Sequence, residues 1–412
     1  MTIDVDQAVA SRRAIEALRA GVPSRDAVAA TGSGQSAIED KFSQVRDRAS
    51  SGHPGGLLIG GGFGTGKSHL LEHLSGLALD AGFAVSRVVI SKETPLYDPA
   101  KVFAAAVESA AVSGRPRPAL VEAAAALDPE SRAYAELLRW ASSSGSGLNE
   151  RFPATLSLHA QVQQSDPTYA ETIVRFWSGD PINTPELRRR LKEAGEPRPS
   201  LPPVTVKDLA VQRIGFAARL LAAAGSAGWV ILFDEVELIG RYSLQQRARS
   251  YAEITRWMQG DHGGKGTPIA AVIAMTDDFE AAVITGRRDR EVVPEKLKAK
   301  QTPEATALAT VAQRGMRTID REMQLITPPD GAELDRAYAQ LKKLHGEVFD
   351  WQPPDVEGLE RLGATRMRQY VRAWINEWDL LRLDPDYQPA TEIADEIASD
   401  YREDPDLEPG EA

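Results

Sequence analysis

The sequence lacks cysteine altogether, and no apolar run approaches the roughly 18 residues that a membrane-spanning helix needs. Without cysteine the protein has no disulfide, no zinc–thiolate site and no cysteine nucleophile. The first residues, Met1 to Asp6, do not show the charged and then apolar pattern of a signal peptide. We therefore expect a soluble, cytoplasmic protein with no membrane partner, and its 412 residues suffice for more than one domain.

Basic residues are nearly absent from one end of the chain. Residues 384–412 hold eleven acidic residues and a single base, Arg402, so this tail carries −10 of the net charge of −11. Residues 1–383 are therefore close to neutral. Acidic tails of this kind are usually solvated and disordered, which we expect here. The alternative is a tail that competes for a basic surface on this protein or on a partner.

A complete phosphate-binding pattern, G-x-x-x-x-G-K-[ST], lies at residues 61–68 between a strand-like and a helix-like segment. The glycines let successive backbone N–H groups face a phosphate, Lys67 can reach the β- and γ-phosphates, and Ser68 can offer its hydroxyl to Mg²⁺. The pattern predicts binding of a nucleoside triphosphate. The residues predicted to contact it are Gly61, Gly62, Phe63, Gly64, Thr65, Gly66, Lys67, Ser68 and His69.

An apolar run that ends in two acids supplies the second half of the predicted site. Residues 230–233 read Val-Ile-Leu-Phe, which suits a strand buried on both faces, and Asp234 and Glu235 follow. Carboxyl ends of such strands are where α/β sheets bind ligands. There Asp234 can hold Mg²⁺ through water, and Glu235 can polarise an attacking water.

Two further candidates come from later segments. The buried-strand pattern at 269–275 ends at Thr276, which we expect to point at the γ-phosphate; Asp277 is the adjacent candidate, and an ordinary capping threonine is the alternative. Arg366 opens an amphipathic helix and could reach the phosphates from a lid domain. Arg368 and Arg372 are expected to face elsewhere.

The chain divides by composition and helical periodicity. Ser24 is expected to cap a short helix, and Thr184 to cap a helix with Pro185 in its first turn. A Pro-rich stretch at 197–203 closes a helical region that separates the two halves of the predicted site. We predict an N-terminal helical segment (1–50), a nucleotide-binding core (51–112 and 206–328), a helical insertion (113–205), a helical lid (329–383) and the acidic tail (384–412).

The order of phosphate loop, Asp-Glu strand, polar strand end and lid arginine is similar to that of AAA+ ATPases. Residues 233–238 (Phe-Asp-Glu-Val-Glu-Leu) and Pro328-Pro329-Asp330 before a helical lid resemble the origin-recognition (initiator) branch. More narrowly, the chain resembles the ATP-binding proteins of BREX bacteriophage-exclusion systems, the BrxC/BrxD P-loop family, and its compact BrxD type most. The segments that carry this resemblance are 12–23, 59–74, 89–99 and 365–373.

This resemblance implies an α/β AAA+ P-loop ATPase with a parallel sheet, a helical insertion and a small all-helical lid. It implies ATP and Mg²⁺ as ligands, with Lys67, Asp234, Glu235, Thr276 and Arg366 in catalysis and Ser68 and Asp234 at the metal. It also implies a homo-oligomer, in a ring or filament, that acts with other defence-system proteins on DNA or DNA-modifying partners. Arg317 and Arg321 are candidates for an arginine offered to a neighbouring subunit's γ-phosphate.

Two departures from the AAA+ pattern bear on function. Lys67 and Asp234 are 167 positions apart, far more than one or two βαβ units of about 30 residues need, which points to the insertion. The lid ends near Leu383 without the winged-helix DNA reader of the origin-recognition relatives, so double-stranded DNA would need another surface. The segment 287–321, with nine bases and five acids, is one candidate.

Other functions use the same nucleotide-binding residues. One is a nucleotide-gated assembly switch with little turnover, and another is a DNA-loading or transposition-type ATPase of the origin-recognition branch. A nucleotide kinase is disfavoured, because the Asp234-Glu235 pair suits attack by water.

Overall fold

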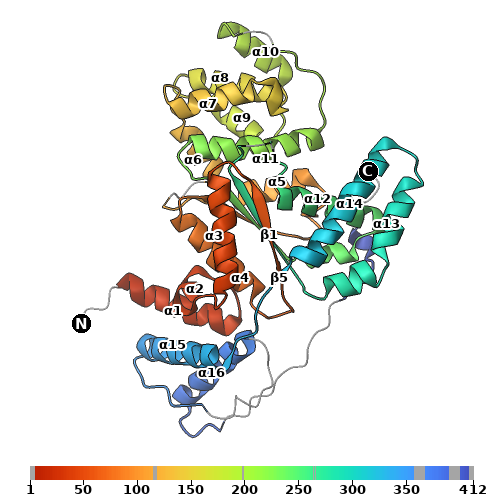
Figure 1. Ribbon diagram of the computed structural model, residues 1–412. Helices are drawn as coiled ribbons and strands as arrows, with labels where there is room; N and C mark the ends of the chain where they lie inside the picture. Colours follow the sequence, from red (N-terminus) through yellow and green to blue (C-terminus); the bar gives the residue numbers. More distant parts are fainter. Residues whose placement is uncertain are drawn as a thin grey trace.

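The computed structural model describes residues 5–114, 118–196, 199–262, 264, 266–356, 367–388 and 400–407. Within these residues a five-stranded sheet lies at the centre of the molecule (Figure 1). Its strands follow the order β2-β3-β4-β1-β5, and every neighbouring pair is parallel. The strands are β1 (Gly55–Gly60), β2 (Ala84–Val89), β3 (Trp229–Asp234), β4 (Ile269–Met275) and β5 (Gln324–Leu325).

The two central strands are buried along their whole length, as their continuous apolar runs predict. Side chains alternate between the faces of the sheet: Ile231 and Phe233 belong to one core cluster, Val230 and Leu232 to another. Strand β5 was not predicted, because two residues are too few to show a periodic pattern.

Helices cover both faces of the sheet. On one face α3 (Ser36–Ser50) and α4 (Lys67–Asp80) share a hydrophobic cluster with the strands, through Phe42 and Leu71 among others. The larger cluster on the other face includes residues of several helices. These are α5 (Pro99–Glu108), α11 (Val206–Ala223), α12 (Leu244–Gln259), α13 (Asp289–Lys298) and α14 (Pro303–Glu322). The short segments η2 (Val236–Arg241) and η3 (Glu280–Thr285) follow β3 and β4.

The region predicted as an insertion is helical and lies beyond α11 in Figure 1. It packs around Phe152, Phe176 and Trp177. Phe152 and Trp177 contact Phe216 of α11, and Phe176 contacts Phe152. Asn183, not Thr184, caps its last helix, since the Asn183 side chain accepts from the N–H of Glu186 at 3.0 Å. Its elements are α6 (Ala119–Ala126), α7 (Arg132–Ala141), η1 (Ser144–Ser146), α8 (Arg151–Val162), α9 (Pro167–Ser178) and α10 (Thr184–Glu193).

Helices from the N-terminal segment and from residues 331–383 meet in a separate helical cluster. It joins α1 (Val5–Ala20) to α15 (Gly331–Phe349) and α16 (Met367–Leu383), with Trp374 and Trp378 at its centre. These tryptophans are buried, as the amphipathic pattern of this segment predicts. Between α1 and α3 lies α2 (Arg25–Thr31), which Ser24 caps as predicted. Arg366 lies outside the described residues. No helix in the described part of the chain is long and apolar enough to cross a membrane.

Eight residues of the acidic tail, 400–407, lie against the core instead of projecting into solvent. Tyr401 packs on Phe279 next to η3, and the short helix η5 (Pro405–Leu407) lies near Gln246 of α12. This differs from the expectation of a solvated tail, because basic side chains that are distant in the sequence come together on this surface.

Candidate nucleotide-binding site

The phosphate-binding pattern forms the turn between β1 and the start of α4. Gly64 and Gly66 have φ of 75° and 106°, in the left-handed region that glycine adopts without steric cost. The loop is tied to the sheet, because the N–H of Gly61 donates to the carbonyl of Met275 at the end of β4. All nine residues predicted to contact nucleotide thus lie on one loop and the first turn of one helix, which is a common arrangement for anion binding.

Lys67 is buried inside this loop. Its ammonium donates to the carbonyl oxygens of Gly61, at 2.6 Å, and Gly62, at 3.1 Å. Burial lowers the pKa of Lys67 below its ordinary value, although the nearby carboxylates of Glu237, Asp234, Asp277 and Asp278 act in the opposite direction. A buried cation that contacts carbonyl oxygens and has acidic neighbours is suited to receive a phosphate.

The acidic pair lies at the carboxyl end of β3, which Asp234 ends, and β3 is separated from β1 only by β4. Asp234 is buried, and its carboxylate accepts from Arg87 of β2 at 2.7 Å. Glu235 is exposed and has φ of 58°, a left-handed conformation that is strained for a residue with a side chain. Partial desolvation of its carboxylate and the charge of Asp234 raise the pKa of Glu235.

Thr276 follows β4 directly and is buried. Because β1, β3 and β4 are parallel neighbours, their carboxyl ends bring the phosphate loop, the acidic pair and Thr276 to one edge of the sheet. The Thr276 hydroxyl is hydrogen-bonded to the hydroxyl of Tyr401. Asp277 also lies beside the loop, since a Cβ placed on Gly62 would be 3.9 Å from its Oδ1.

Two charged residues of the site were not singled out from the sequence. Glu237 is buried with its Oε1 3.9 Å from the Lys67 ammonium, and within the described residues its Oε2 has no hydrogen-bond partner. Arg87 bridges Asp234 and Glu72 of α4. Glu237 lies two residues beyond Glu235, a spacing that could have suggested it. Arg87 gives no such signal, because nothing in its own segment points to Asp234.

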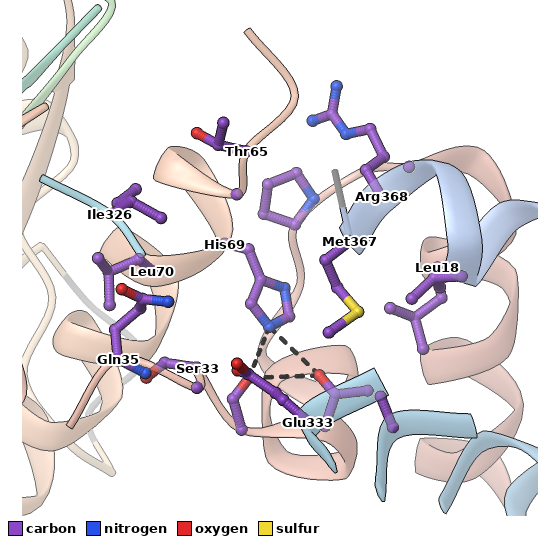
Figure 2. A pocket seen from close by; sticks show the side chains of 18 of the residues that line it. Leu18, Ser33, Gln35, Thr65, His69, Leu70, Ile326, Glu333, Met367 and Arg368 are labelled. Atoms are coloured by element: carbon purple, nitrogen blue, oxygen red, sulfur yellow. Dashed lines mark hydrogen bonds between the residues drawn. The ribbon is translucent and has the colours of Figure 1, made fainter. Parts of the chain in front are cut away.

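A pocket of about 300 Å³ adjoins the phosphate loop. It lies between the segment after α1, the start of α4 and the helices α15 and α16, and its lining includes Thr65, Gly66 and His69. Figure 2 shows His69 with Leu70 and Ile326 on one side and Met367 and Leu18 on the other. A volume near 300 Å³ is within the range of small-molecule sites.

His69 joins the phosphate-loop helix to the N-terminal segment. Its Nε2 lies 2.9 Å from the carbonyl oxygen of Gly32 and 3.2 Å from the Thr31 hydroxyl. Arg368 also lines the pocket, contrary to the expectation that it faces elsewhere. Arg317 and Arg321 are both exposed on α14.

An all-parallel sheet with a phosphate loop after β1 defines a mixed α/β protein whose fold is consistent with that of P-loop nucleotide-binding proteins. Within that class, residues 7–124 match the family of BREX system ATP-binding proteins BrxC/D, which confirms the family predicted from the sequence. The match covers the N-terminal helices, the phosphate loop and β2, and it indicates an ATP-binding component of a BREX system. Neither the curated proteins nor the solved structures contain a match to this chain.

Proposed function

We propose that this protein is an AAA+ ATPase that binds and hydrolyses ATP within a BREX-type bacteriophage-defence complex. The observation that carries the proposal is the common sheet edge of β1, β4 and β3. It brings the phosphate loop, Thr276 and the pair Asp234-Glu235 together, with Thr276 between the other two. A group that senses the γ-phosphate has to lie in that position.

Each residue has a distinct role in this proposal. Lys67 exchanges the carbonyl oxygens of Gly61 and Gly62 for the β- and γ-phosphates. Glu235 orients the attacking water and accepts its proton, for which a raised pKa is favourable. Thr276 donates its hydroxyl hydrogen to the γ-phosphate. Arg366 is proposed to reach the phosphates from the lid.

Ser68 and Asp234 would hold magnesium. Both are hard oxygen donors, and Mg²⁺ in phosphoryl-transfer sites takes one or two protein ligands besides the phosphates and waters. When bound, the ion neutralises charge that develops on the phosphate oxygens. In the described structure the Asp234 carboxylate is paired with Arg87, so this pair must rearrange or be shared when the ion binds.

The pocket beside Thr65 and His69 would hold the adenosine part of ATP. It begins at the phosphate loop, and apolar side chains such as Leu70 and Met367 can cover the flat faces of a base. The pocket also joins core and lid, because Glu333 of α15 and Arg368 of α16 line it. In this proposal the helical lid predicted from the sequence closes on the nucleotide.

Assembly and partners follow from the same proposal. The exposed side chains of Arg317 and Arg321 on α14 are available to a neighbouring subunit, which would make the active form a homo-oligomer. The family match supports other BREX proteins as partners. Contact with double-stranded DNA is part of the same proposal.

The test is ATP hydrolysis by the wild type and by Glu235→Gln, each with and without double-stranded DNA, with ATP binding measured separately. We expect the variant to bind ATP and to lose hydrolysis. The matched control is Glu171→Gln, an exposed glutamate on α9 that pairs only with Arg175 in the described structure. Equal hydrolysis by wild type and Glu235→Gln would refute the role of Glu235. A wild type that binds ATP but turns over far below about 1 s⁻¹, and that partners do not stimulate, would favour the nucleotide-gated switch.

A further inference from the structure

The docked part of the acidic tail, residues 400–407, is called the strap here. It crosses η2 and the start of α12, and basic side chains hold it there. The N–H of Asp404 donates to the Arg241 carbonyl at 3.0 Å, and its carboxylate pairs with the Arg241 guanidinium. Glu403 accepts from Arg247 at 2.7 Å and lies 3.5 Å from Arg287.

Arg247 is a preorganised anchor for this carboxylate. Its side chain is only 3% exposed, and Asp289 holds it through two hydrogen bonds of 2.8 and 2.9 Å. Its remaining nitrogen, Nη1, donates to the Tyr242 carbonyl and to Glu403. An arginine fixed by a buried network loses little conformational freedom when it binds an acidic segment.

Tyr401 occupies a socket shaped for its ring. The ring meets Phe279 edge to face, with centroids 5.9 Å apart. A Cβ on Gly240 would lie 2.6 Å from Cδ1 of Tyr401, so the absence of a side chain at Gly240 makes room for the ring. The Tyr401 hydroxyl lies between Asp278, at 2.7 Å from its Oδ1, and Thr276.

The number of hydroxyl hydrogens in this group determines what the strap does to Thr276. An ionised carboxylate only accepts, so the single hydroxyl hydrogen of Tyr401 goes to Asp278. In the bond between the two hydroxyls, Thr276 must then donate to the oxygen of Tyr401. A phosphate oxygen is also only an acceptor, and Thr276 has one hydroxyl hydrogen. While the strap is docked, Thr276 has no hydrogen to offer to a γ-phosphate.

We propose that the surface formed by Gly240, Arg241, Arg247, Phe279 and Arg287 is a binding site for an acidic peptide that carries a tyrosine, and that the strap is its occupant and holds the ATPase site inactive. The proposal rests on the proposed role of Thr276. The strap fits this site by charge, because its four acids outnumber its one arginine. Hydrolysis requires that the strap leave or that the γ-phosphate displace the hydroxyl of Tyr401.

The test uses the full-length chain and a variant that lacks a single oxygen atom. Tyr401→Phe keeps the ring in its socket and removes the oxygen that accepts from Thr276. We expect kcat for ATP hydrolysis to rise about threefold to tenfold, the size of one hydrogen bond. Arg175→Ala is the control: Arg175 on α9 is 66% exposed and, among described residues, pairs only with Glu171, so kcat should not change. A kcat for Tyr401→Phe at or below the wild-type value overturns the inhibitory role.

Docking itself is measured by hydrogen exchange at the N–H of Asp404, which needs no catalysis. Exchange should be slow in the wild type and fast in the double variant Glu403→Gln, Asp404→Asn. The nonhydrolysable analogue AMP-PNP with Mg²⁺ should speed it, since phosphate and Tyr401 compete for Thr276. Fast exchange in the wild type overturns the peptide site, and exchange that the analogue leaves unchanged overturns the competition.

These readouts separate this inference from the proposed function. If Thr276→Ala hydrolyses ATP as fast as the wild type, the sensing role of Thr276 is wrong, and the inhibitory part of the inference falls with it. Slow exchange at Asp404 would still support the peptide site in that case. If the wild type hydrolyses no ATP at all, the response of exchange to AMP-PNP decides whether nucleotide and strap compete.

Discussion

The guanidinium of Arg87 lies 2.7 Å from the carboxylate of Asp234, so the acid proposed to hold magnesium is paired with a cation from its own sheet. Arg87 belongs to β2 and Asp234 ends β3, and the register of the two parallel strands, with Val89 opposite Asp234, brings them together. Arg87 also contacts Glu72 on the phosphate-loop helix at 3.4 Å. A divalent ion at Asp234 therefore meets a positive charge that is already in place.

Arg87→Met removes this charge and keeps an unbranched apolar stem. We expect the concentration of Mg²⁺ that gives half-maximal ATP binding to fall about threefold to tenfold, because the ion no longer competes with an arginine that is partly exposed. A titration of Mg²⁺ at a fixed ATP concentration measures this midpoint. Arg175→Met, which breaks an exposed pair with Glu171, should leave the midpoint unchanged. A midpoint that rises in Arg87→Met would show instead that Arg87 assists the ion.

Glu235 combines a proposed catalytic role with a left-handed backbone, φ 58°. That conformation costs an ordinary residue about 1 kcal/mol or more, whereas glycine adopts it freely. Glu235→Gly should therefore abolish hydrolysis while leaving the free energy of unfolding equal to or higher than that of the wild type. The matched control, Glu171→Gly inside α9, should lose about 1 kcal/mol, because glycine disfavours a helix. Denaturant unfolding of the three proteins measures both effects, and a Glu235→Gly variant as destabilised as the control would contradict the strain argument.

The raised pKa of Glu237 predicts that the stability of the protein depends on pH. Burial raises its pKa in the folded protein, and the nearby Lys67 only partly opposes this. Above the ordinary pKa of a glutamate, the folded state then binds more protons here than the unfolded state, so this group lowers stability as pH rises up to the raised pKa. The glutamine of Glu237→Gln does not titrate, so this variant does not lose stability in this way as pH rises.

We expect the unfolding free energy of Glu237→Gln relative to the wild type to increase as pH rises from about 4.5 toward neutrality. Denaturant unfolding at several pH values without nucleotide measures it. Glu171→Gln, at an exposed site, should show no such trend. A difference that stays constant with pH would mean that Glu237 has the same pKa in both states.

The sequence predicted the parts of the site that are continuous in the chain. The phosphate loop is a local pattern, and the strands before Asp234 and Thr276 are apolar runs with polar ends. Parallel strands bring such ends to one edge, so their proximity could be expected. The position of strand β5 could not be predicted, because its two residues pair with β1 only through the tertiary fold.

Contacts between distant charges escaped prediction for a different reason. Arg241, Arg247 and Arg287 form the basic surface that contacts Glu403 and Asp404, yet they stand on different elements. Read along the chain, the tail is simply acidic, which favours a solvated state. Only the folded arrangement shows that three arginines converge on it.

His69 is the best test of the pocket beside the phosphate loop, because it holds the segment after α2 in place. The Gly32 carbonyl can only accept, so Nε2 of His69 carries the hydrogen, and burial lowers the pKa of the ring, which keeps it neutral at neutral pH. His69→Ala should raise KM for ATP about threefold to tenfold and leave kcat nearly unchanged, since it loosens a wall of the pocket and leaves the hydrolytic residues alone. His73→Ala, one turn further along α4 and paired with Glu39, is the control and should leave both constants unchanged. Steady-state kinetics of the two variants would contradict the pocket assignment if His73→Ala raised KM as much as His69→Ala, or if His69→Ala lowered kcat alone.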